Sequence, residues 1–154
     1  MKKSLYFIFL LLILVNACKQ QQSTIKSIEK IPSGDVSLLS PEQVVTLYFQ
    51  AWNDKQYDVM YSLISDGFKQ IEPTAKTFEG FKSYMEKFYE TSLGIRIVEA
   101  SEAYNNGQEA GIEYKIEITN KDGDIKEFSS TYTLKKRTNG WKLIHPYGEN
   151  IDTT

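Results

Sequence analysis

The chain has 154 residues, with 18 lysines and arginines against 20 aspartates and glutamates, and a formal net charge of −2 at pH 7. This balance argues against nucleic-acid binding, which draws on clustered basic side chains to displace counterions. The single cysteine and single histidine exclude a disulfide within the chain and leave too few ligands for a zinc site.

The N-terminal residues have the layout of an export signal. Lys2 and Lys3 give a short positive start, and an almost unbroken apolar run follows from Leu5 to Val15. This run is about half as long as the roughly twenty apolar residues that a membrane-spanning helix needs. We therefore predict a cleavable signal peptide over residues 1–17.

The end of this leader carries a more specific pattern. Its last residues and the cysteine after them, LVNAC ending at Cys18, resemble the lipobox of bacterial lipoproteins, in which a small residue precedes a cysteine that is diacylated before cleavage. The resemblance implies cleavage before Cys18 and acyl chains such as palmitate on it, and two chains are enough for stable anchoring. We expect a lipoprotein of the cell envelope, held on the non-cytoplasmic side of a membrane; the alternative is an ordinary secreted protein.

Residues 18–39 are polar after the cysteine and are interrupted by Pro32, Ser33 and Gly34. This composition has too little apolar content for a core of its own and predicts a flexible tether. About 115 residues remain, a normal size for one domain. We assign residues 40–148 to this domain and residues 149–154 to a C-terminal tail.

Three helices are predicted at the start of the domain. Ser40, Pro41 and Gln43 form a capped helix start, and the helix runs to about Trp52 with a wide apolar stripe. A second helix is expected over residues 57–64, ended by Ser65-Asp66-Gly67, and a third over residues 77–91. The other face of the first helix is polar: Gln43, Thr46, Gln50 and Asn53.

Beyond Gly94 the apolar residues alternate with polar ones, which predicts strands. We expect strands over residues 95–104, 109–119, 125–136 and 141–145. Turn pairs of Asn or Asp with glycine, ending at Gly107, Gly123 and Gly140, join them as consecutive hairpins. The predicted fold class is α+β: three N-terminal helices packed on a curved four-stranded antiparallel sheet, a cystatin-like cone with a pocket at its wide end.

This order of elements and several segments resemble a known family. The segments are SPEQVVTLYFQAWNDKQYDVMYSLIS, TFEGFKSYMEKFYE with GIRI after it, and NGWKLIHP. They resemble the nuclear transport factor 2-like (NTF2-like) superfamily over residues 40–147, and more narrowly the non-catalytic N-terminal domain of penicillin-binding proteins and small lipoproteins made of that domain alone. The superfamily includes isomerases, dehydratases and binding domains, so the fold does not select the function. The resemblance also implies a homodimer through the sheet face.

The candidate pocket combines the lone histidine with aromatic residues on faces predicted to be buried. If the last strand is regular, Trp141, Leu143, His145 and Tyr147 share one side, and an imidazole beside phenols could abstract a proton or polarise a carbonyl. The alternative is that His145 closes the strand end beside Pro146 while the tyrosines belong to the core. The full candidate set is His145, Tyr114, Tyr132, Tyr48 and Trp52.

No motif for a catalytic nucleophile, a phosphate loop or a calcium loop occurs in the sequence. We therefore predict a non-enzymatic domain, without cofactor or metal, that binds an envelope protein, a peptide or a cell-wall component. The alternative is a small-ligand carrier or a ketosteroid-isomerase-like enzyme that uses His145 with Tyr114 or Tyr132.

Overall fold

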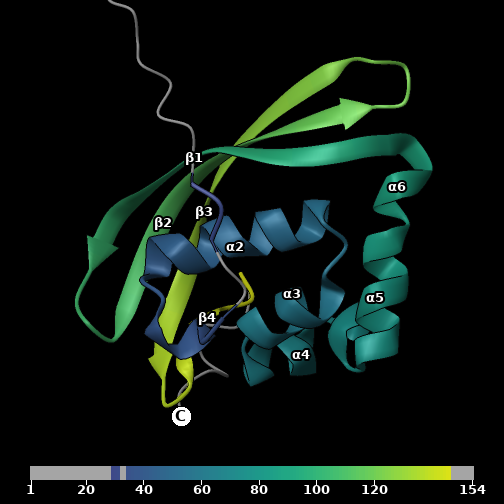
Figure 1. Ribbon diagram of the computed structural model, residues 1–154. Helices are drawn as coiled ribbons and strands as arrows, with labels where there is room; N and C mark the ends of the chain where they lie inside the picture. Colours follow the sequence, from purple (N-terminus) through teal and green to yellow (C-terminus); the bar gives the residue numbers. More distant parts are fainter. Residues whose placement is uncertain (1–28, 32–33, 147–154) are drawn as a thin grey trace, which may run out of the picture.

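The computed structural model describes residues 29–31 and 34–146 (Figure 1). Helices come first along the chain and strands follow, as predicted. The elements are η1 (Val36–Leu38), α2 (Pro41–Asn53), α3 (Tyr57–Leu63), α4 (Asp66–Ile71), η2 (Pro73–Ala75), α5 (Phe78–Glu86), α6 (Phe88–Thr91), β1 (Ser92–Asn105), β2 (Glu109–Asn120), β3 (Ile125–Arg137) and β4 (Gly140–Leu143).

The strands form one antiparallel sheet in the order β1-β2-β3-β4, so each strand lies beside its neighbour in sequence. Figure 1 shows the long strands curving around α2, with the other helices on the same side of the sheet. Register shifts in β1, among them one between Ile97 and Glu99, mark irregularities that bend an edge strand. The predicted α+β fold, with helices on a curled four-stranded antiparallel sheet, is confirmed.

The core lies between α2 and the concave face of the sheet. Its centre is the apolar stripe of α2, which needs burial on more than one side and finds it against the sheet and α3. The largest fully buried side chains include Leu47 and Phe49 from α2, Ile112 from β2, Leu134 from β3 and Leu143 from β4. The helices and the sheet therefore share a single core.

The start of α2 is capped as the sequence predicts. The Ser40 hydroxyl accepts a hydrogen bond from the Gln43 amide, and the Gln43 side chain accepts one from the Ser40 amide. The second helix, α3, ends at Leu63, within one residue of the predicted end. Ser65, which was expected only to end that helix, is also the N-cap of a further helix, α4, because its hydroxyl accepts from the Phe68 amide. The helix expected over residues 77–91 is divided at Lys87 into α5 and α6.

The three predicted hairpins are present. Gly107, Gly123 and Gly140 each have a positive φ, the conformation for which glycine is favoured in tight turns. The last strand is shorter than predicted: β4 ends at Leu143, so His145 lies beyond it. Just beyond β4 the Ile144 amide still donates to the Thr133 carbonyl of β3, while the Leu143 carbonyl accepts a hydrogen bond from the Ser65 amide on the other edge of β4.

Part of the segment assigned to the tether lies against the domain. Residues 29–31 contact α2, and η1 packs beside the β3–β4 hairpin, where a Cβ on Gly140 would lie 2.8 Å from the Ser37 Cα. The signal peptide, Cys18 and the C-terminal tail, as well as Tyr147, lie outside the described residues.

Candidate functional site

Four of the five predicted pocket residues lie together in one aromatic cluster, which we define as Tyr48, Phe49, Trp52, Tyr114 and Tyr132. The Tyr114 and Tyr132 rings stack with centroids 4.9 Å apart, and Phe49 lies 4.9 Å from Tyr114. Tyr48 lies 6.0 Å from Tyr132 and Trp52 lies 6.3 Å from Phe49. The cluster arises because α2 crosses the concave face at the inward-facing positions of β2 and β3.

The hydroxyl groups of this cluster act as hydrogen-bond donors rather than as bases. Burial raises the pKa of Tyr48, Tyr114 and Tyr132 above the usual value for a phenol. Tyr114 is hydrogen-bonded to the side chains of Ser130 and Tyr132. The three phenols therefore stay protonated near neutral pH and can donate to one another or to a polar group at the edge of the cluster.

The indole of Trp52 is a hydrogen-bond donor of the cluster that has no acceptor among the described residues. Its Nε1 is buried and has no hydrogen-bond partner among the described residues, while its ring packs 4.9 Å from Phe88. The buried hydroxyl of Tyr57 also has no hydrogen-bond partner among the described residues. An unpaired buried donor costs free energy, so the packing of these large rings must outweigh that cost.

His145 has a different set of neighbours. Its ring packs edge-to-face on Phe68, with centroids 5.0 Å apart, and its Nε2 lies 3.6 Å from a carboxylate oxygen of Glu72. Hydrogen bonds from Thr74 hold the pKa of the Glu72 carboxyl below its usual value, and His145 adds to that effect. His145 thus lies against Phe68 and Glu72, while Tyr114 and Tyr132 lie in the aromatic cluster.

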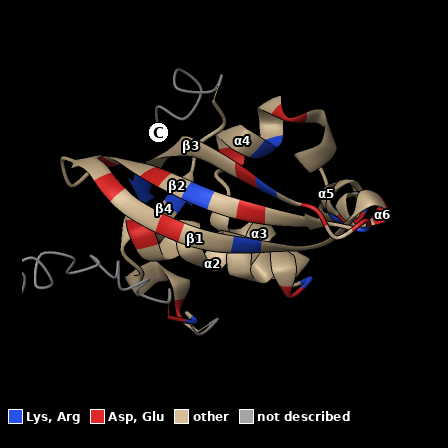
Figure 2. Cartoon of the chain, turned by 90° about the horizontal axis from the view of Figure 1, so that it is seen from above, with Lys and Arg blue, Asp and Glu red and all other residues tan. Residues whose placement is uncertain are grey.

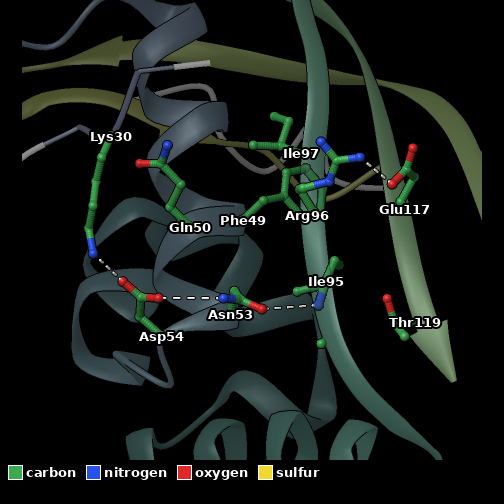
Figure 3. Close-up of a pocket in the computed structure, with 11 residues that line it drawn as sticks. Lys30, Phe49, Gln50, Asn53, Asp54, Ile95, Arg96, Ile97, Glu117 and Thr119 are labelled. Carbon is green, nitrogen blue, oxygen red and sulfur yellow. Dashed lines mark hydrogen bonds and ion pairs between the residues drawn. The ribbon is translucent and has the colours of Figure 1, made fainter. Parts of the chain in front are cut away.

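A cleft of about 480 Å³ lies between α2, the residue 29–31 segment and the edge strand β1 (Figure 3). We call it the edge cleft. No local sequence pattern predicts this cleft, because its walls come from four separate parts of the chain. The lining residues are Lys30, Phe49, Gln50, Asn53, Asp54, Gly94, Ile95, Arg96, Ile97, Glu117 and Thr119.

Polar contacts run across the edge cleft from one wall to the other. The Lys30 ammonium lies 2.7 Å from the Asp54 carboxylate, and the Asn53 amide nitrogen lies 3.5 Å from that same carboxylate group. The Asn53 side-chain oxygen then accepts a hydrogen bond from the Ile95 amide at 3.2 Å (Figure 3). Gly94 permits this approach, since a Cβ there would lie 3.0 Å from the Asn53 oxygen.

The main chain of residues 29–31 is bound by the side chain of Gln50, beside the Lys30–Asp54 ion pair and the packing of Ile31 on the core. The Gln50 carboxamide accepts from the Ile31 amide at 2.9 Å and donates to the Glu29 carbonyl at 3.0 Å. A carboxamide has the same donor and acceptor as a peptide group, so Gln50 pairs with this segment as a neighbouring strand would. The contact uses main-chain atoms of the segment and does not depend on its side chains.

The convex face of the sheet is polar and carries basic and acidic residues on adjacent strands (Figure 2). Arg96 and Glu117 pair across β1 and β2 at 2.6 Å, and Lys115 and Glu127 pair across β2 and β3 at 2.9 Å. The hydrogen bond with Glu127 raises the pKa of Lys115. A shallower hollow of about 340 Å³ crosses this face. Ion pairs at a surface contribute little to stability, so these pairs do not by themselves explain the stability of the sheet.

The described part of the chain has neither a metal-binding cluster nor a helix that could cross a membrane. No group of three or more histidine, cysteine, aspartate or glutamate side chains there could hold a metal ion. Within residues 29–31 and 34–146, no helix has the length and apolar character that crossing a membrane requires.

The curled sheet, the helices on its concave face and the aromatic cluster between them define an NTF2-like domain. The family model for the NTF2-like N-terminal transpeptidase domain matches residues 40–146. The chain belongs to this family, and its domain is like the non-catalytic N-terminal domain of penicillin-binding proteins. No curated protein matches the chain.

Solved structures share the fold at low sequence identity. A SEC-C motif containing protein from Rhodopseudomonas palustris has a TM-score of 0.53 and 15% identity, over 69% of this chain and 76% of that one. An NTF2-like protein of unknown function from Shewanella oneidensis has a TM-score of 0.50 and 13% identity, over 66% of this chain and 90% of that one. These likenesses concern the fold alone.

Proposed function

We propose that this protein is a lipid-anchored component of a bacterial cell envelope, whose NTF2-like domain binds a protein, a peptide or a cell-wall component without catalysing a reaction. The observation that carries the proposal is the family match over residues 40–146, because members of this family accompany transpeptidases as non-catalytic domains. The pattern at Cys18 adds the anchor.

The geometry of the domain supports binding rather than chemistry. The phenols of the aromatic cluster are protonated and packed against one another, and His145 contacts Phe68 and Glu72. The edge cleft and the charged convex face, in contrast, lie at the surface of the domain. A partner would therefore meet the domain at a strand edge or a sheet face.

The binding proposal is tested in intact envelopes. The full chain with an affinity tag is compared, after chemical crosslinking, with a matched chain that keeps residues 1–39 and lacks the domain. We expect a specific partner to be recovered with the full chain and lost with the deletion. Equal recovery from both chains, or recovery of no partner, would contradict the proposal.

The anchor is tested separately by mass spectrometry of the native product and by labelling with palmitate. We expect Cys18 to be the acylated N-terminal residue and the Cys18→Ser variant to leave the membrane fraction. A free thiol on Cys18, or an uncut leader, would contradict the anchor and leave the binding proposal to be judged by the crosslinking experiment.

A further inference from the structure

We propose that the edge cleft binds an extended peptide segment of a partner protein, which adds as a further strand to the edge of β1 that faces away from β2, at the Ile95 carbonyl and the main-chain groups of Ile97. This inference rests on the proposed binding function and names the class of partner and its place on the domain. Three features of the cleft support it: the strand edge, the opposite wall and the arrangement of side chains.

The first feature is the position of β1. The sheet order places it at an edge, paired with β2 on one side. The Ile95 amide donates to Asn53, which lies on the side away from β2. Because alternate residues of a strand direct their main-chain groups to the same edge, the N–H and C=O of Ile97 are directed into the cleft as well. These are the groups that pair with an added strand.

The second feature is the opposite wall, which already holds an extended polypeptide. Gln50 binds the Glu29 carbonyl and the Ile31 amide through main-chain hydrogen bonds alone. Lys30, between them, is tied to Asp54. A strand entering the cleft would thus lie between two main-chain surfaces, β1 and the 29–31 segment, with α2 beneath it.

The third feature is the side-chain pattern. Phe49, Ile95 and Ile97 form an apolar floor, while the charges at the rim are already paired, Lys30 with Asp54 and Arg96 with Glu117. The cleft has no excess charge to neutralise. It therefore fits an uncharged strand of alternating pattern, with small apolar residues facing the floor and polar residues facing outward.

The test uses the full chain, isotopically labelled and kept in detergent micelles, with synthetic capped peptides of about seven alternating valines and threonines. Amide shifts should map to residues 94–97. Two further peptides carry N-methyl groups, one on every valine amide and the other on every threonine amide. Since these two sets of amides face opposite edges of a strand, the peptide whose N-methyl groups face β1 should lose at least tenfold in affinity, and the other should lose clearly less.

Two variants complete the design. Gln50→Ala releases the opposite wall and should weaken peptide binding severalfold. Phe128→Ala alters an exposed residue of β3, outside the cleft, and should leave binding unchanged. Shifts at residues 125–131 in place of 94–97, equal binding of both N-methylated peptides, or binding of glycan fragments with no peptide binding would each overturn the inference. None of these outcomes changes the result of the envelope crosslinking experiment, which tests the proposed function separately.

Discussion

Replacing Gln50 by alanine should release residues 29–31 from the domain while the sheet and helices stay folded. The substitution removes two hydrogen bonds, from the Ile31 amide at 2.9 Å and to the Glu29 carbonyl at 3.0 Å. A neutral hydrogen bond contributes about 0.5–1.5 kcal/mol net, so the pair holds the segment by about 1–3 kcal/mol. Protection of the Ile31 amide against hydrogen exchange should then fall on the order of 5- to 150-fold.

The matched variant Gln50→Glu separates the two bonds. It keeps the acceptor for the Ile31 amide and loses the donor to the Glu29 carbonyl, so protection should fall to an intermediate level. Hydrogen exchange followed by NMR measures Ile31 in both variants, with core amides as an internal reference. Unchanged protection of Ile31 in Gln50→Ala, or equal loss of protection in core amides, would refute the assignment of Gln50 as the group that holds this segment.

Three further perturbations test the core, the N-terminal packing and the buried phenols. Phe49→Ala should cost about 3–5 kcal/mol of unfolding free energy in urea titrations, because Phe49 is 2% exposed within the aromatic cluster. Gly140→Ala should cost about 1–3 kcal/mol, because residue 140 has φ +103° and its Cβ would meet the Ser37 backbone. Raising the pH above about 10 should destabilise the fold, because the unfolded phenols ionise there while burial keeps Tyr48 and Tyr132 protonated.

Each of these predictions has a direct check. Tyr84→Ala, at a residue 54% exposed on α5, is the control for Phe49 and should change stability by less than about 0.5 kcal/mol. A Gly140→Ala variant with unchanged melting temperature would show that η1 does not pack at the β3–β4 hairpin. Phenolate absorbance that is complete while the protein remains folded would refute the burial of the two phenols.

The local patterns of the sequence predicted most of the architecture because they depend on interactions between residues that are close in the sequence. The capping box at Ser40 and Gln43 and the glycines of the three hairpin turns are decided by neighbouring residues, and both appear as expected. The contact of the third helix with α2, in contrast, joins residues far apart in the sequence. The Tyr89 hydroxyl donates to the Trp52 and Asn53 carbonyls, 37 and 36 residues away, and so supplies a hydrogen bond to carbonyl groups at the C-terminal end of α2. No spacing within residues 77–91 encodes that contact.

The site was predicted in part for the same reason. Alternation placed Tyr114 and Tyr132 on the buried face, and helical spacing placed Tyr48 and Trp52 opposite them. His145 was extrapolated from a strand that ends two residues earlier, where Leu143 pairs with the segment before α4. The edge cleft had no signal at all, because its walls meet only after the helix, the strand and the N-terminal segment are assembled.

The polar face of α2 shows that polar residues on one side of an amphipathic helix can bind main-chain groups as well as face solvent. Gln43, Thr46, Gln50 and Asn53 would ordinarily form the solvated side of a helix. In the structure Gln43 caps the helix, Thr46 is 4% exposed, Gln50 holds an extended segment and Asn53 caps the edge of β1. Gln43, Gln50 and Asn53 therefore bind main-chain groups, although Gln43 and Asn53 also remain exposed to water. Carboxamides suit that position because they pair with peptide groups without charge, and the same property makes the adjoining cleft suited to another peptide strand.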